Sequence, residues 1–201
     1  GLIIRSSAMG INEDSIMDDI NAMHDLADDV MSQTSGEPDL IMPAPSAEMR
    51  AWRDWVNPYP DEVVNTAGSF ENMGVWDHIE RLKQSRVSMP DGASMIIEPT
   101  SALVAVDVNT GNDFSLHAGL KANLSVAKEL PKQLALRGLG GQVVIDFAPS
   151  PKKDRHTIET ALTSAFRKGN IDTVIVGWTT LGNFELQRKR ERIPLTELLT
   201  D

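Results

Sequence analysis

The 201-residue sequence contains no cysteine. These residues can therefore form neither a disulfide nor a zinc site with thiolate ligands, and the composition fits a reducing compartment. No apolar stretch approaches the roughly 20 residues that a membrane-spanning helix needs. The first residues also lack the basic start and apolar core of a signal peptide. We therefore expect a cytoplasmic protein without a membrane segment.

Basic residues are scarce in the first part of the chain. Residues 1–80 contain sixteen Asp and Glu but only three Lys and Arg, whereas residues 81–201 contain thirteen acids and sixteen bases. The formal net charge of −10 argues against a protein that coats nucleic acid along its whole surface. The second part nevertheless holds enough cations for a local basic site.

The pattern of apolar residues predicts a mixed α/β fold. Helical spacing predicts helices at residues 13–31, 47–55, 74–82, 116–137 and 155–168. Apolar runs predict strands at residues 1–4, 86–89, 93–98, 102–108, 140–147 and 172–177. The order strand, helix, strand over residues 102–147 is typical of parallel neighbours joined by a crossover helix. The continuous apolar character of these two strands suits a sheet covered on both faces.

Each of these two strands delivers an aspartate at its end. The run Leu103-Val-Ala-Val leads to Asp107, and the run Val143-Val-Ile leads to Asp146. Parallel neighbours would bring both carboxylates to one edge of the sheet, where a divalent cation between them would offset their repulsion. An aspartate at a strand end is also a common turn former or helix cap, and this alternative stays open for each residue alone.

The chain resembles the ribonuclease E/G family of bacterial endoribonucleases through the order and spacing of several short motifs. They include Val-Asp-Val-Asn at 106–109, Val-Ile-Asp-Phe at 144–147 and Leu-Arg-Gly-Leu-Gly-Gly at 136–141. Further matches lie at residues 1–6, 50–54, 89–94, 121–124 and 181–190. The resemblance implies a DNase I-like catalytic subdomain at residues 83–201. It also implies a 5′-sensor-like portion at residues 1–45 and an RNase H-like portion at residues 46–82.

The resemblance also implies a function and a set of site residues. Asp107 and Asp146 stand where the family binds catalytic Mg²⁺, with Mn²⁺ as an alternative ion, and Asn109 stands where the family positions the scissile phosphate. Arg5 and Ser6 stand where the family grips a 5′-monophosphate. The implied reaction is cleavage of single-stranded RNA to 5′-phosphate and 3′-hydroxyl ends, within RNA processing and decay.

Basic residues of the second part are candidates for contact with the RNA backbone. Two alternatives stay open: an isolated arginine such as Arg5 can form a surface ion pair, and a basic run can be a solvated face. The candidates are Lys152, Lys153, Arg188, Lys189 and Arg190.

Several family features have no counterpart in these 201 residues. The upstream S1 domain and the zinc-linking cysteine pair are missing, so we expect a shortened or partial form whose homo-oligomer, if one forms, has no zinc link. Family acids near residue 116 and at Pro149 are also replaced. Two alternatives follow: a relative that binds RNA or a protein without cutting, and a chain that acts only together with an S1 portion.

Overall fold

The computed structural model describes residues 2–4, 8–55, 60–115, 117–169 and 171–199, with the side chains of residues 53–55 left out. The chain divides into two compact units, Gly1–Val64 and Asn65–Asp201. Within the described ranges, no helix is long and apolar enough to cross a membrane.

The first unit contains two helices, α1 (Glu13–Ser32) and α2 (Ala47–Trp55). The side chain of Asn12 caps α1, because its Oδ1 accepts a hydrogen bond from the Ser15 backbone N–H at 2.7 Å. No residue of α1 is buried. Leu2–Ile4, where we predicted a strand, has no regular secondary structure, so that prediction is wrong for these three residues.

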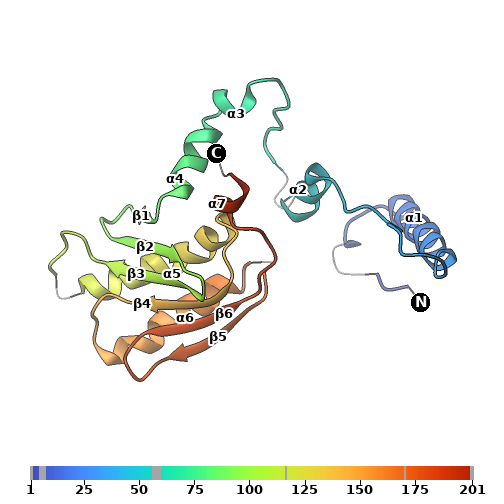
Figure 1. Cartoon of the computed structure of the whole chain (residues 1–201). Coiled ribbons are helices and arrows are strands. Elements are labelled where there is room, and N and C mark those ends of the chain that lie inside the picture. Colours follow the sequence, from blue (N-terminus) through green and yellow to red (C-terminus); the bar gives the residue numbers. More distant parts are fainter. Residues whose placement is uncertain (1, 5–7, 56–59, 116, 170, 200–201) are drawn as a thin grey trace. The chain divides into compact units, whose positions relative to one another are not determined.

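The second unit is built around a six-stranded sheet with the strand order β1-β2-β3-β4-β6-β5 (Figure 1). The strands are β1 (Arg86–Ser88), β2 (Ser94–Pro99), β3 (Leu103–Asn109), β4 (Gly141–Asp146), β5 (Thr173–Trp178) and β6 (Phe184–Arg188). The helices are α3 (Ser69–Asn72), α4 (Val75–Lys83), α5 (Ala118–Leu136), α6 (Arg155–Phe166) and α7 (Leu195–Leu198). A short 3₁₀ helix, Lys152–Asp154, precedes α6. The predicted mixed α/β class is confirmed.

The centre of the sheet is the predicted crossover unit. Strands β3 and β4 are parallel, with Leu103 opposite Gln142 and Asp107 opposite Asp146. The other strand pairs are antiparallel, and α5 connects β3 to β4 (Figure 1). Pro131 lies inside α5, which remains one helix from residue 118 to residue 136.

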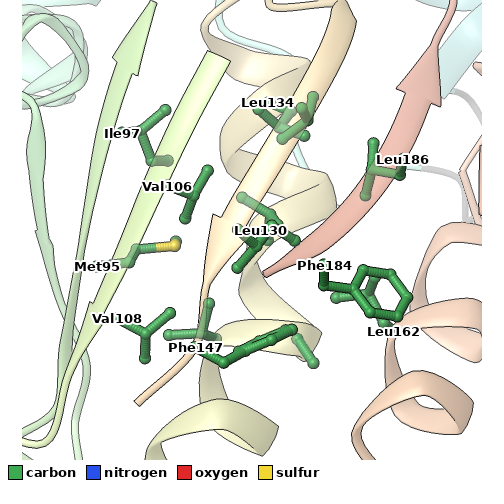
Figure 2. Packing of buried hydrophobic residues seen from close by; sticks show 14 of the residues in the cluster. Met95, Ile97, Val106, Val108, Leu130, Leu134, Phe147, Leu162, Phe184 and Leu186 are labelled. Atoms are coloured by element: carbon green, nitrogen blue, oxygen red, sulfur yellow. The ribbon is translucent and has the colours of Figure 1, made fainter. Parts of the chain in front are cut away.

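The hydrophobic core lies between one face of the sheet and helices α5 and α6. Figure 2 shows Leu130 and Leu134 of α5 and Leu162 of α6 beside the apolar side chains of the strands. Burial alternates along β3, where Val104, Val106 and Val108 are buried while Asp107 and Asn109 are exposed. Our prediction that both faces of these strands are covered is therefore wrong for this chain. We call the sheet face that points away from α5 and α6 the open face.

The edge strand β5 carries an irregularity in its pairing with β6, between Ile175 and Gly177. Gly177 has a φ of 117°, a backbone conformation that favours glycine. Strand β6 was missed by our sequence analysis, which treated its last residue only as part of a basic run, either in contact with RNA or on a solvated face. Its alternation of buried Phe184, Leu186 and Arg188 with less buried Glu185 and Gln187 is the period-2 signal of a strand.

Candidate functional site

Asp107 and Asp146 are cross-strand neighbours at one end of the parallel pair β3–β4. They are the last residue pair in the register of these strands, whose backbones lie about 4.8 Å apart in a sheet. Directly paired residues point to the same face, and both side chains are exposed on the open face. The structure thus brings the two carboxylates together.

Asn109 belongs to the same group, because it lies two residues beyond Asp107 on the same face of β3. Its Nδ2 donates a hydrogen bond to Oδ2 of Asp107 at 2.6 Å. This bond orients the Asp107 carboxylate and leaves the Asn109 carbonyl oxygen and a second N–H for another partner. The three residues form one polar cluster, which we call the carboxylate edge.

Asn123 of α5 fixes the loop that follows Asp146. Our sequence analysis gave this residue no role. Asn123 is fully buried in α5. Its Nδ2 donates to the carbonyl of Ala148, its Oδ1 accepts from the Ala148 N–H, and both distances are 2.9 Å. A buried asparagine inside an apolar helical face is the sequence signal that could have revealed this clamp.

Gly119 brings the first turn of α5 against the same loop. A Cβ atom at this position would lie 2.0 Å from the carbonyl oxygen of Pro149, so only glycine allows this approach. Asn123 and Gly119 together hold residues 147–149 and thereby the end of β4. The backbone that carries Asp146 is therefore fixed by α5.

The loop between β3 and α5 has its own anchor at Asp113. The Asp113 carboxylate accepts a hydrogen bond from the Ser115 N–H at 2.9 Å and lies 3.3 Å from the Lys121 ammonium. The hydrogen bonds from Ser115 lower the pKa of Asp113, and Lys121 adds to the effect. Asp113 therefore stays ionised and holds the start of the loop.

The donor set of the carboxylate edge fits a hard cation such as Mg²⁺. This ion typically takes one or two protein carboxylates and keeps several waters, and Asp107 and Asp146 supply two carboxylates on an exposed face. Within the residues that the structure describes, no cluster of three or more His, Cys, Asp or Glu side chains could enclose a metal. Mg²⁺ and Mn²⁺ keep bound waters, so an open site with two protein ligands suits these ions better than a site enclosed entirely by protein ligands would.

The predicted RNA-contacting cations divide into two groups. Lys152 and Lys153 are exposed on the 3₁₀ helix that follows the loop after Asp146. The residues 188–190 instead lie at the opposite end of β4, because β6 is antiparallel to it and Arg188 pairs with Gly141. Five residue steps along β4 separate Gly141 from Asp146, which is about 16 Å.

Arg188 differs from our expectation of a surface cation. Its side chain is only 3% exposed, donates to Oγ1 of Thr173 at 3.2 Å and stacks over the Phe166 ring at 5.8 Å. Burial lowers the pKa of its guanidinium. Lys189 is exposed and paired with Glu191 at 3.0 Å, and the Glu191 hydrogen bond raises the pKa of Lys189. The Arg190 guanidinium lies beside the backbone of Gly141.

The two predicted 5′-phosphate residues, Arg5 and Ser6, lie outside the described residues. Their roles remain predictions from the resemblance.

Comparison with known proteins connects the carboxylate edge to a family. Residues 62–191 match the model of the ribonuclease E/G family. Ribonuclease G of Haemophilus influenzae is 28% identical over 238 residues, an alignment that covers 100% of this chain and 48% of that protein. Ribonuclease G of Escherichia coli K12 is 32% identical over 136 residues, covering 65% of this chain and 28% of that protein.

Ribonuclease E of Escherichia coli K12 is 33% identical over 127 residues, covering 60% of this chain and 12% of that protein. The chain thus spans about half the length of these relatives or less. The family match includes all of β1 to β6, with Asp107, Asn109 and Asp146. This chain belongs to the ribonuclease E/G family.

Proposed function

We propose that this chain is a Mg²⁺-dependent endoribonuclease that cleaves single-stranded RNA. The observation that carries the proposal is the pairing of Asp107 with Asp146 on the open face, with Asn109 hydrogen-bonded to Asp107. Family membership supports the reaction class. The alignments cover 48% or less of the ribonuclease G relatives. The activity of those longer proteins is therefore a proposal for this chain.

Asp107 and Asp146 would hold the cation through their carboxylate oxygens. When bound, a divalent ion supplies neutralisation of charge on the phosphoryl oxygens and a more acidic water. Asn109 keeps the Asp107 carboxylate oriented and offers its second amide N–H to a phosphoryl oxygen of the substrate. The open face gives a flexible polymer access to all three residues.

The remaining parts of the proposal concern the substrate and its ends. Hydrolysis that leaves a 5′-phosphate and a 3′-hydroxyl agrees with the family resemblance. Lys152 and Lys153 would contact the backbone next to the carboxylate edge, and Lys189 and Arg190 would do so only at the other end of β4. Arg5 and Ser6 would recognise a 5′-monophosphate, since an arginine fork can bond two phosphate oxygens.

The location and the subdomain assignments are also part of the proposal. We propose a cytoplasmic enzyme that takes part in RNA processing and decay, and any homo-oligomer would form without a zinc link. Residues 1–45, 46–82 and 83–201 would correspond to the 5′-sensor-like, RNase H-like and DNase I-like portions.

The decisive experiment compares cleavage of a 5′-monophosphorylated, A/U-rich single-stranded RNA by the wild-type chain and by Asp107→Asn and Asp146→Asn. Each substitution removes one anionic ligand, so we expect a loss of at least about 100-fold in the Mg²⁺-dependent rate, in the range of lost catalytic groups. Asp172→Asn is the matched control, because Asp172 is an exposed aspartate outside the carboxylate edge.

Full cleavage by Asp107→Asn would refute the metal assignment. RNA binding without any cleavage by the wild type would refute the enzyme proposal in favour of a binding function.

A further inference from the structure

A groove of about 650 Å³ lies at the β1 edge of the sheet, between α4, β1 and the second half of α5. This volume is within the range of ligand-binding clefts. Its apolar floor is formed by Val75, Ile79, Leu82, Val87 and Leu136. All of its residues lie within the second unit.

The polar side chains of this groove are basic or neutral. Arg81, Arg86, Lys132 and Arg137 line it together with His78, and no Asp or Glu is among the described residues of its lining. Four cations line this one surface, whereas the second unit as a whole holds sixteen Lys and Arg against sixteen Asp and Glu. Such a local concentration of positive charge attracts polyanions to this place.

Arg137 builds the wall of the groove and is not itself available to a ligand. It is 7% exposed, and its guanidinium donates to the carbonyl of Gln84 at 2.6 Å and to Oε1 of Gln133 at 3.3 Å. The bond to Gln84 links the residue that follows α4 to the end of α5.

The other three cations are exposed on the rim. Arg81 donates one hydrogen bond to Nδ1 of His78 at 3.0 Å, which uses only one of its five N–H groups. Lys132 is 3.9 Å from Glu129, a distance typical of a weak surface pair. Arg86 begins the edge strand β1. Their N–H groups remain available for phosphate oxygens.

The sheet register connects this rim to the carboxylate edge. Arg86 pairs with Ile96, Ile96 pairs with Asp107, and Asp107 pairs with Asp146. These four residues form one row on the open face, whereas α5 and Val87, which line the groove, belong to the other side of the sheet. An RNA strand in the groove therefore reaches Asp107 by passing around the β1 edge beside Arg86. Two strand spacings separate the Arg86 backbone from that of Asp107, which is about 10 Å.

We propose that the groove between α4, β1 and α5 binds the phosphodiester backbone of the RNA whose scissile bond lies at Asp107 and Asp146. This inference rests on the proposed function for its ligand. It adds a substrate-binding surface at the β1 edge, with Arg81 and Arg86 as the phosphate contacts. The apolar floor lies against the sugar and base of the same nucleotides.

The experiment measures binding of a fluorescein-labelled single-stranded RNA to the full chain by anisotropy, in EDTA and at a series of KCl concentrations. We compare the wild type with Arg81→Ala/Arg86→Ala and with the control Lys128→Ala/Lys168→Ala. The control removes the same charge from exposed positions outside the groove. Each lost phosphate contact on a single strand reduces the slope of log K against log salt by about 0.7.

We expect the groove variant to bind roughly tenfold more weakly at 100 mM salt and to lose about 1.4 from the slope, while the control keeps the wild-type slope. Arg81→Lys/Arg86→Lys should also keep that slope, and circular dichroism checks that every variant is folded.

Equal losses in the groove and control variants would overturn the proposal, as would RNA binding that is absent in the wild type or unchanged in the groove variant. RNA binding measured in EDTA does not depend on cleavage. The groove proposal and the Mg²⁺-site proposal can therefore be refuted separately.

Discussion

Asn123 shows how one buried polar side chain determines the order of an exposed site. It satisfies both hydrogen-bonding groups of the Ala148 backbone, and Ala148 lies two residues after Asp146. Apolar packing could bury the same volume but could not pair these two groups. The precision of the carboxylate edge thus depends on a residue in the core.

The first prediction concerns Asn123→Ala. The substitution leaves a buried N–H and a buried C=O of Ala148 without partners, at about 1–3 kcal/mol each. We expect the free energy of unfolding to fall by about 2–4 kcal/mol in urea titrations and Mn²⁺ affinity to fall with it. Lys128→Ala, on the exposed side of the same helix, is the control. A loss equal to that of the control would show that the two bonds contribute nothing.

A second prediction concerns pH and Asp113. The pKa of this carboxyl is lowered in the folded protein, chiefly by the Ser115 hydrogen bonds. Its ionised form therefore stabilises the fold above the ordinary aspartate pKa of about 3.9, and this contribution is lost as pH falls through the lowered folded value. We expect Asp113→Asn to be less stable than the wild type at neutral pH, with the difference vanishing in acid. Urea midpoints measured across pH test this, and a difference that does not vary with pH would contradict it.

At the scale of elements, α5 both covers the core and fixes the site. Its apolar side chains Leu130 and Leu134 are fully buried, while its first turn contacts the loop after β4 through Gly119. A change in the first turn therefore acts on the end of β4.

The third prediction is that Gly119→Ala destabilises the protein although alanine favours helices. The gain in helix propensity is about 1 kcal/mol, but the new Cβ would lie 2.0 Å from the Pro149 carbonyl oxygen, and such overpacking costs about 1–3 kcal/mol. We expect a lower urea midpoint and weaker Mn²⁺ binding. Gly169→Ala, where the nearest contact would be 3.4 Å, is the control, and equal midpoints for both variants would refute the clash.

The sequence permitted the central crossover to be predicted, because β3 and β4 are apolar, β-branched runs separated by a helix of adequate length. The juxtaposition of Asp107 and Asp146 follows from that topology. The sequence did not permit the burial of Arg188 to be predicted, because that burial depends on the position of β6 between β4 and β5. Nor could the sequence predict the groove, because its walls include residues far apart in the chain, such as Gln84 and Arg137, which lie 53 positions apart and share a hydrogen bond.

At the scale of the whole molecule, stability and charge are distributed unequally. The described hydrophobic core consists of residues from the second unit alone, whereas α1 of the first unit buries none of its residues. Most of the excess negative charge precedes residue 81. The sheet therefore carries its own stabilising contacts.

The fourth prediction follows from this division. The excised segment 65–201 should unfold cooperatively, with a thermal midpoint within a few degrees of that of the full chain. Thermal circular dichroism of both chains measures this. A midpoint lower by more than about 8 °C would mean that the first unit contributes more than 1 kcal/mol to the stability of the second.

The parallel register of β3 and β4 also has a kinetic consequence. Asp107 and Asp146 stand 39 positions apart in the chain, and their strands pair across the connection that contains α5. Such non-local pairing is completed late in folding, because chain entropy must be lost before the contact forms. A partly synthesised or partly folded chain therefore has no paired carboxylates, and the proposed metal site forms only together with the folded sheet.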